Sequence, residues 1–360
     1  MIAKYPVCRD DAIYHAWPDM ALQGDRMICV FSECPDHGDR SYTRIMVTHS
    51  EDRGRTWTTK RPVTPGLTKH GPDDPHWNCP RVTALDDGRL VVIVDKVSGA
   101  GEGNKPGGRQ TNWMFFSDDG GLTWSDAVPT PIEGIVPDKV TVLRYGSQPG
   151  RWLVSAQTCR ADEKGEEIWR SYAWFSDNEG LSWTGPCFIA GRSDLKLCEG
   201  SFLELPDGEL VCFFRENSRM GRDAYKVFSR DGGVTWEGLV EMPIPACHRP
   251  VAGMLQSGEV LVTYRYEPGG RGRRENWAQN VFASLTDVES CKARSRAEAS
   301  TRVLPLDYDR ADRPDTGYTG WVQFPDGEIH VVTYIVDDAP KGQIRGYAFR
   351  ESAFRISSSD

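Results

Sequence analysis

The chain of 360 residues is 39% hydrophobic and 26% charged, and it contains 12 tryptophans. This composition supplies a large buried core and is not that of a disordered protein. The formal net charge of −9 argues against general binding to nucleic acid or to an anionic membrane, because both require a positively charged protein surface. No apolar stretch is long enough to span a membrane, and the N-terminal residues lack the apolar centre of a signal peptide, so we expect a cytoplasmic protein.

The ten cysteines are scattered, without C-x-x-C pairs or the cysteine and histidine spacing of a zinc site. We therefore expect buried thiols in a reducing compartment, and neither a metal ion nor an organic cofactor. Repeat folds commonly form one unit of this length, so we expect a single domain over residues 1–360. The sequence does not indicate an oligomeric state.

Six segments along the chain each contain two apolar runs, usually separated by Asp-Gly or Ser-Gly. They cover residues 18–31, 80–94, 137–146, 200–214, 250–264 and 319–334. Alternating apolar residues on both sides of a turn signal are typical of two antiparallel strands joined by a short turn. Each segment therefore predicts such a pair of strands.

A second element, S-x-[DN]-x-G-x-[TS]-W, which we call the box, follows the first four segments. Its copies are SEDRGRTW from Ser50, SDDGGLTW from Ser117, SDNEGLSW from Ser176 and SRDGGVTW from Ser229. The short acidic or amide side chain and the glycine suit a tight turn, after which the tryptophan returns to the core. Strand-like runs such as TNWMFF at 111–116 precede the copies, so we expect a hairpin turn between a third and a fourth strand.

Six units in 360 residues leave about 60 residues for each, enough for a four-stranded sheet. The fifth unit has only the degenerate SLTDVES and the sixth has no box, as expected where the chain closes a ring. Helical periodicity is almost absent. The fold class that we predict is all-β, a six-bladed β-propeller with four-stranded antiparallel blades.

Repeated boxes on six blades resemble the sialidase (neuraminidase) superfamily, and the resemblance covers essentially the whole chain. The box also occurs in non-catalytic propellers, so function has to be inferred at the centre of the ring, which the innermost strands line. Counting six residues back from the last apolar residue before each turn gives Ala16, Cys79, Pro137, Glu199, Arg249 and Tyr318. Three consecutive blades thus offer an acid, a base and a phenol at one register, which favours a functional site.

The resemblance implies roles for four residues. Tyr318 in DTGYTGW matches the family's nucleophile, and Glu199 in CEGSF matches the base that activates it. Arg215 and Arg249 match arginines that bind the substrate carboxylate through charge-assisted hydrogen bonds. Sialic acid carries that carboxylate on its anomeric carbon, so a neutral tyrosine avoids the repulsion that a carboxylate nucleophile would meet.

The resemblance also implies an aspartate that protonates the leaving oxygen, in the loop of the first blade ahead of the first box. Asp39 in CPDHGDR is the best match for this acid/base residue, and Asp36 is the second. A carboxyl group that donates a proton near neutral pH needs a raised pKa, and we expect one here.

The sequence departs from the family at the first of its three carboxylate-binding arginines. The family has Arg-Ile-Pro, whereas this chain has HAWP at 15–18, with Ala16 at the arginine position. Losing one guanidinium contact should cost about 2 kcal/mol of substrate binding, more than tenfold in affinity. Either another cation substitutes, with Lys139, Arg81 and Arg40 as candidates, or the substrate is not ordinary sialic acid.

Histidines and tryptophans near these positions are further candidates for substrate binding. Three histidines are expected near the same face: His15, His37 and His248. Three tryptophans are close to the register positions: Trp17, Trp77 and Trp321. Tryptophans of this kind can stack on a sugar, although packing in the core is the simpler expectation.

Three functions remain open, all with a carbohydrate as partner. The first is an exo-acting, retaining glycoside hydrolase for an acidic sugar, sialic acid or a relative. The second is a propeller lyase or other glycosidase for uronic-acid-containing oligosaccharides, in which tyrosine or histidine abstracts a proton beside a neutralised carboxylate; the missing arginine and the additional histidines motivate it. The third is a non-catalytic carbohydrate-binding propeller, against which the pairing of Glu199 with Tyr318 argues.

Overall fold

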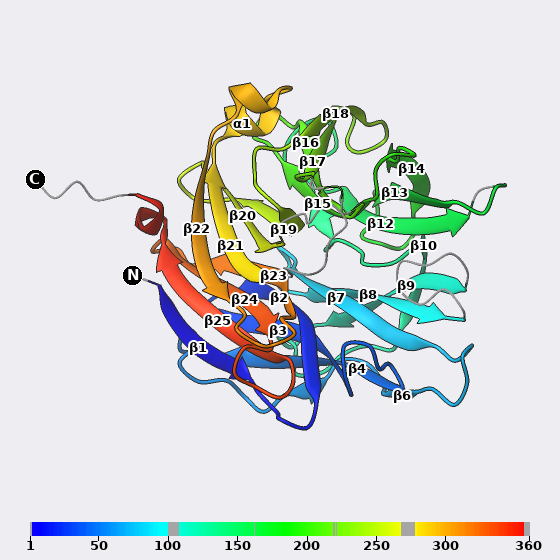
Figure 1. Ribbon diagram of the computed structural model, residues 1–360, viewed down its shortest axis with the longest axis vertical. Helices are drawn as coiled ribbons and strands as arrows, with labels where there is room; N and C mark the ends of the chain where they lie inside the picture. The colour runs from blue at the N-terminus through cyan, green and yellow to red at the C-terminus, as the bar shows by residue number, and fades with distance from the viewer. Residues whose placement is uncertain are drawn as a thin grey trace, which may run out of the picture.

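Six antiparallel sheets surround a common centre in the computed structural model (Figure 1). The structure describes residues 2–99, 108–161, 163–218, 220, 222–267 and 278–355. Within these ranges, helix is limited to α1 (Val288–Lys292) and to 3₁₀ turns at Arg296–Glu298 and Glu351–Phe354. The predicted six-bladed all-β propeller with four-stranded blades is confirmed.

The first three blades follow one another in chain order, each with its innermost strand first. The first contains β2 (Tyr14–Gln23), β3 (Arg26–Cys34), β4 (Tyr42–Ser50) and β5 (Arg61–Pro62), and β6 (Leu67–Thr68) also pairs with β4. The second contains β7 (His76–Ala84), β8 (Leu90–Ser98), β9 (Arg109–Ser117) and β10 (Val128–Glu133). The third contains β11 (Thr141–Val142), β12 (Trp152–Ala161), β13 (Glu167–Ser176) and β14 (Thr184–Ala190).

The other three blades repeat this order. The fourth contains β15 (Leu197–Glu204), β16 (Leu210–Glu216), β17 (Tyr225–Ser229) and β18 (Glu237–Glu241). The fifth contains β19 (Cys247–Met254), β20 (Val260–Tyr266), β21 (Asn280–Thr286) and β22 (Thr301–Tyr308). The sixth contains β23 (Thr316–Gln323), β24 (Glu328–Ile335), β25 (Gln343–Arg350) and, as its outermost strand, β1 (Ala3–Cys8).

The sixth blade closes the ring with strands from both ends of the chain. β1 pairs antiparallel with β25, and Ala3 lies opposite Ala348. The two strands run side by side in Figure 1. Because the backbone hydrogen bonds of this pair connect the chain ends, the ring cannot open without breaking them.

The third blade differs from the prediction, because its innermost strand is reduced to the two residues of β11. Val136 has a left-handed φ of 49°, and Pro137 has no N–H to donate to a neighbouring strand. Residues 135–138, before β11, form separate contacts with β12 in place of a continuous strand pair. Ile135 bridges to Gln157, and the N–H of Asp138 bonds to the carbonyl of Ser155.

The predicted box turns lie between the third and fourth strands of the first four blades. In the second box, the hydroxyl of Ser117 donates to Asp119 (2.9 Å) and accepts the N–H of Gly121 (2.8 Å). Asp119 also accepts the N–H of Thr123 (2.9 Å). In the third box Asn178 takes the place of the aspartate and accepts the corresponding bonds. Side-chain hydrogen bonds within the box thus stabilise its turn, which explains why the box is repeated.

We expect Asp119→Ala to lower the free energy of unfolding by roughly 1–2 kcal/mol, because several backbone and hydroxyl donors of the turn lose their acceptor. Asp119→Asn should lose less, since Asn178 performs the same task in the third box. Urea unfolding followed by tryptophan fluorescence measures both. Equal midpoints for Asp119→Ala and the wild type would contradict this role.

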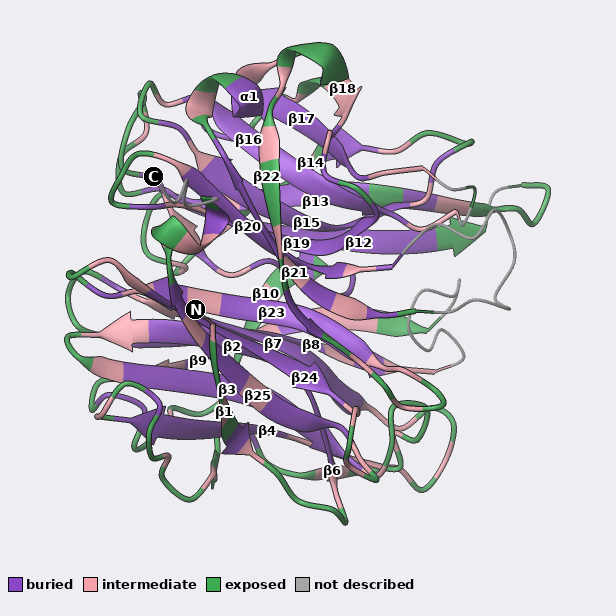
Figure 2. Ribbon diagram, turned by 60° about the vertical axis from the view of Figure 1, so that its left-hand side comes forward, coloured by how far each residue is buried: buried purple, intermediate pink, exposed green. Residues whose placement is uncertain are grey.

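The inner strands are buried along nearly their whole length (Figure 2). Their apolar side chains pack between neighbouring blades, as where Leu203, Val211 and Phe213 of the fourth blade share one apolar cluster with Val262 of the fifth. When a sheet packs against other sheets on both faces, nearly all residues of its strands are apolar. A polar side chain on an inner strand is therefore exceptional, and such residues mark the site.

All ten cysteines are free thiols, and eight of them are buried. This agrees with the predicted buried thiols. Among the described residues, no helix is long and apolar enough to cross a membrane, and no cluster of histidine, cysteine, aspartate and glutamate could hold a metal ion.

Candidate active site

Three inner strands begin with a β-bulge that carries a residue of left-handed φ. Glu199 in β15, Arg249 in β19 and Tyr318 in β23 have φ of 56°, 52° and 53°, and the strand register shifts at each of them. Such a φ costs a non-glycine residue about 1–3 kcal/mol, and strain of this kind is concentrated at functional sites. The bulges turn the three side chains toward one another at the centre of the ring.

In the first blade the equivalent position belongs to Trp17 and not to Ala16, which corrects the register counted from the sequence. The bulge of β2 lies between Ala16 and Asp19, and Trp17 has φ of 51°. Gln23, the last residue before the turn, is polar, so the last apolar residue is Leu22. Counting back from Leu22 therefore gave a position that is off by one.

Tyr318, Glu199 and Arg215 are in direct contact. The Tyr318 hydroxyl donates to Oε1 of Glu199, and Arg215 Nη1 donates to the same oxygen at 2.9 Å. Both Glu199 and Tyr318 are buried, and the second carboxylate oxygen, Oε2, has no hydrogen-bond partner. A buried acceptor without a partner can take a proton or bind a ligand donor.

Burial and charge give the pair distinct protonation states. Burial by itself raises the pKa of Glu199, but Arg215, Arg265 and Arg249 outweigh it, and the net pKa is lowered. Burial, followed by the nearby carboxylate, raises the pKa of Tyr318 well above its ordinary value. The resting pair is therefore a neutral phenol beside a carboxylate that can accept its proton.

Three guanidinium groups surround this pair. The Arg249 side chain is fully buried, with Cζ 5.4 Å from the ring centre of Tyr318, and its Nε and Nη1 have no partner. Arg265 Cζ lies 5.9 Å from the same ring, and Arg215 also has a buried Nε without a partner. Unpartnered guanidinium nitrogens at one place are suited to bind a carboxylate in a bidentate manner.

Arg265 was not among the cations considered from the sequence. It occupies in β20 the position that Arg215 occupies in β16, since each lies opposite the residue before the bulge, His248 and Cys198 respectively. A signal for it existed, because LVCFFRE at 210–216 aligns without gaps with VLVTYRY at 260–266. Comparison of second strands between blades would have found it.

His248 lies beside these arginines as a neutral ring. Its Nδ1 is 3.2 Å from Oε2 of Glu267, which also forms an ion pair with Arg265 Nε at 3.3 Å. Burial, followed by the charge of Arg215, lowers the pKa of His248 to about 4. The predicted candidate is thus in the site, as a neutral side chain between the arginines and Glu267.

Arg81 and Lys139 were proposed as substitutes for the missing arginine, and the structure favours neither. Arg81 is fully buried, with Nη2 3.3 Å from Asp19 and Nη1 bonded to the carbonyl of Thr319. It connects the first, second and sixth blades. Lys139 is partly exposed, and no contact among the described residues joins it to Tyr318 or to the three arginines.

Three other candidates belong to the packing of the blades. His15 is buried against Phe31, with Nε2 2.8 Å from Lys60, and burial followed by that charge lowers its pKa to about 3. The indole N–H of Trp77 bonds to the carbonyl of Pro65 (3.0 Å), and that of Trp321 to Val251 (3.1 Å). These residues support the fold.

The predicted acid/base residue Asp39 does not have the raised pKa expected of a proton donor. It is exposed, and Oδ1 accepts the N–H of Ser41 at 2.8 Å. This backbone bond is the main cause that lowers the pKa of Asp39. The second choice, Asp36, is exposed and forms an ion pair with Lys341 at 3.0 Å. The carboxylate of Asp39 is therefore stabilised as an anion.

Trp17 packs near the ring of Tyr334, which in turn lies 6.4 Å from that of Tyr318. The Arg40 guanidinium covers the ring of Trp17 at 3.8 Å, and His37 meets the same ring edge-on with 5.4 Å between ring centres. Arg40 and Trp17 thus form a cation–π pair beside the proposed nucleophile. Of the three first-blade candidates, His37 and Arg40 join the site and His15 does not.

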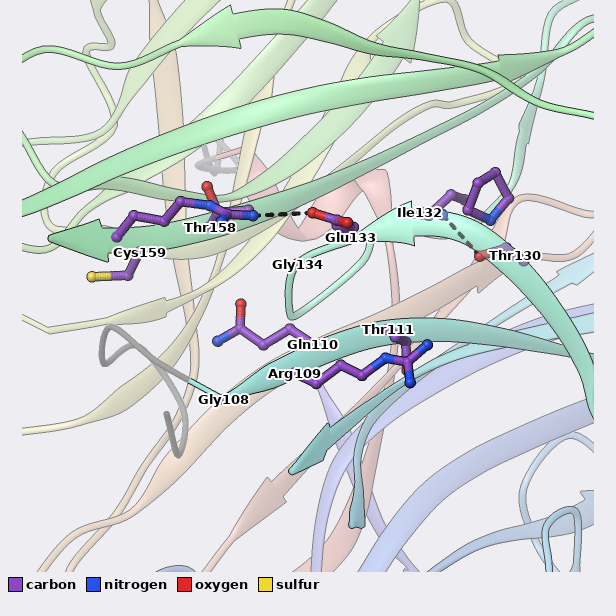
Figure 3. A pocket seen from close by; sticks show the side chains of 12 residues that line it. Gly108, Arg109, Gln110, Thr111, Thr130, Ile132, Glu133, Gly134, Thr158 and Cys159 are labelled. Atoms are coloured by element: carbon purple, nitrogen blue, oxygen red, sulfur yellow. Dashed lines mark hydrogen bonds and ion pairs between the residues drawn. The ribbon is translucent and has the colours of Figure 1, made fainter. Parts of the chain in front are cut away.

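A cavity of about 440 Å³ lies between the second and third blades (Figure 3). Its walls include Thr111, Glu133 and Thr158, and an ion pair connects Glu133 with Arg160 at 3.0 Å. The neighbouring Gln157 accepts the backbone N–H of Glu199 with its side chain. Gln157, next to Thr158 in β12, thus connects this wall of the cavity with Glu199.

Comparison with known proteins agrees with this fold. The model of the BNR repeat-like domain matches residues 23–331. The chain belongs to the BNR repeat-like family. A sialidase of Clostridium perfringens is 26% identical over 274 residues, which are 68% of this chain and 64% of that protein. This BNR repeat-like protein thus spans less than two thirds of the clostridial sialidase.

Solved structures share the fold of this BNR repeat-like protein. A Dyadobacter fermentans protein of unknown function has a TM-score of 0.74 and 21% identity, covering 97% of this chain and 99% of that one. The leech intramolecular trans-sialidase, solved with 2,7-anhydro-Neu5Ac, has a TM-score of 0.69 and 13% identity, covering 96% and 69%. The sialidase-like propeller recognised from the boxes is therefore confirmed as a fold.

Proposed function

We propose that the protein is an exo-acting, retaining glycoside hydrolase for an acidic sugar, sialic acid or a close relative. The main support is the buried contact between the Tyr318 hydroxyl and the Glu199 carboxylate, on two strained bulges. A protein that only bound carbohydrate would not need a tyrosine paired with a base in this way. The sialidase relatives support the same class of substrate.

The reaction begins when Glu199 accepts the proton of Tyr318 and the phenolate oxygen attacks the anomeric carbon. The glycosidic bond breaks, and the leaving oxygen departs with a proton from a donor on the opposite side. Water then attacks the glycosyl–tyrosine bond, the proton returns from Glu199 to the phenolate, and the sugar leaves with its original anomeric configuration. Two inversions give net retention.

Arg215, Arg249 and Arg265 bind the carboxylate of the sugar in this scheme. Nε and Nη1 of Arg249 are buried without a partner, and a carboxylate would satisfy both. Arg265 supplies the third guanidinium that the first blade lacks.

The experiment that tests this proposal follows hydrolysis of α-linked acidic sugars by proton NMR. Release of the α-anomer before mutarotation supports a retaining hydrolase. Release of the β-anomer first would contradict the tyrosine nucleophile, and binding of a glycan without release would assign the protein to the non-catalytic class.

A lyase acting on uronic-acid oligosaccharides is the second candidate, and His248 favours it. A neutral imidazole beside two arginines could take the proton next to a neutralised carboxylate. An unsaturated product that absorbs in the ultraviolet, formed by the wild type and lost in His248→Gln, would assign this reaction and overturn hydrolysis.

A further inference from the structure

The loop from 35 to 41, between β3 and β4, brings a histidine to the mouth of the site. Nδ1 of His37 lies 2.5 Å from Oδ2 of Asp315, and the His37 side chain is 47% exposed. Asp315 directly precedes β23 and is three residues from Tyr318. The His37–Asp315 pair therefore joins the first blade to the strand that carries the proposed nucleophile.

The carboxylate of this pair has a fixed orientation. The hydroxyl of Tyr14 donates to Oδ2 of Asp315, and that of Tyr334 donates to Oδ1 at 2.9 Å. Burial raises the pKa of Asp315, but the bonds with His37, Tyr14 and Tyr334 outweigh it and lower the net pKa. An ionised acceptor at Nδ1 directs the other ring nitrogen, Nε2, to proton exchange.

Ring contacts connect His37 with the reaction centre. Its ring centre is 6.5 Å from that of Tyr334, and Tyr334 in turn is 6.4 Å from Tyr318. Trp17 lies against His37 on another side, at 5.4 Å. His37 is thus at the mouth of the same site, and Tyr318 is at its floor.

We propose that His37 is the proton donor to the leaving-group oxygen, with Asp315 as its positioning residue; this rests on the hydrolase function proposed above. The imidazolium Nε2–H gives its proton to the glycosidic oxygen as the C–O bond breaks, so the leaving group departs as an alcohol. The neutral ring then takes a proton from the water that attacks the glycosyl–tyrosine bond. Each turnover returns His37 to its protonated form.

Titratable and charged groups of several elements face His37. They are Asp315, the hydroxyls of Tyr14 and Tyr334, the Arg40 guanidinium beyond Trp17, and the neighbouring ion pair of Asp36 with Lys341. Among them the carboxylate of Asp315 is the one in contact with the ring. Asp315 therefore orients the ring directly, whereas Arg40 lies on the other side of Trp17.

Two substrates that differ in their leaving group test the proposal. A nitrophenolate leaves without a proton, whereas an alkyl alcohol needs one. For His37→Gln we expect kcat/KM of the nitrophenyl α-sialoside to stay within about tenfold of the wild type, and that of an alkyl-linked sialoside such as sialyllactose to fall at least about 100-fold. His70→Gln, the same change on an exposed loop, is the matched control and should leave both values unchanged.

Asp315→Asn tests the positioning role. Without the carboxylate that stabilises the imidazolium, the alkaline limb of kcat/KM for the alkyl substrate should move to lower pH. An unchanged limb would remove Asp315 from the proposal, and a uniform loss at every pH would point to a structural role only.

The outcomes separate this proposal from the hydrolase function. If the wild type releases no sugar from either substrate, the hydrolase function fails. If the wild type is active and His37→Gln retains both activities, the function stands and His37 is not the donor. A loss confined to the alkyl substrate in Asp39→Asn, and not in His37→Gln, would make Asp39 the donor and overturn the proposal.

Discussion

Tyr318→Phe is expected to fold as the wild type does and to lose about 10³-fold or more in kcat on any sialoside that the wild type cleaves. Phenylalanine retains the ring that packs against Tyr334 and faces Arg249, but it lacks the oxygen that attacks the anomeric carbon. Even an activated leaving group should not rescue this variant, because no covalent intermediate can form. Initial rates with a nitrophenyl sialoside at equal folded concentration measure the effect.

Tyr347→Phe is a matched control for the loss of a buried hydroxyl. Tyr347 in β25 is buried, and its hydroxyl donates to Asp307 at 2.9 Å, as that of Tyr318 donates to Glu199. Both variants should therefore lose a similar amount of stability, about 1–3 kcal/mol, but only Tyr318→Phe should lose turnover. Wild-type turnover by Tyr318→Phe would exclude a tyrosine nucleophile.

Arg265→Met is expected to lower kcat/KM for a sialoside by at least about tenfold, mostly through KM, because the carboxylate loses one of three guanidinium partners. An uncharged analogue, in which an amide replaces the sugar carboxylate, should lose much less. Steady-state kinetics with both substrates measure the difference. An equal loss with the amide would mean that Arg265 does not act through the carboxylate.

Arg265→Met should also change the pH dependence of kcat/KM. Arg265 is one of the charges that lower the pKa of Glu199, so its removal raises that pKa. Glu199 acts as a base only when ionised, and the acid limb of kcat/KM should therefore move to higher pH. Arg151→Met removes a buried arginine that pairs with Asp177 far from the site, and this control should leave the limb unchanged.

The architecture could be predicted because its signals are local and repeated. Each box stabilises its own turn through hydrogen bonds between residues two to four positions apart, as Ser117 and Asp119 do. The turn can therefore be predicted without knowing the contacts with other blades. The alternation of strands and turns predicts the blades in the same way. The strand that closes the ring, β1, has no repeated signal, because its partner β25 lies at the other end of the chain.

Part of the candidate site was also predictable. Glu199, Arg249 and Tyr318 stand at equivalent positions of consecutive inner strands, and the geometry of a propeller brings such positions together. The structure places Tyr318 in contact with Glu199 and beside Arg249, whatever their roles are. The count failed in the first blade, because the residue before its turn is the polar Gln23 and the last apolar residue, Leu22, is one position earlier.

The remaining features depend on contacts between distant parts of the chain. His37 and Asp315 are 278 residues apart and meet only because the first and sixth blades are neighbours in the closed ring. Arg265 lies near Tyr318 although it belongs to a different blade. Arg81 forms an ion pair with Asp19 and a hydrogen bond to the carbonyl of Thr319. Residue type and spacing therefore determine the blades and their turns. Burial, bulges and ring closure decide which charged side chains reach the centre, because each depends on the free energy of packing between blades.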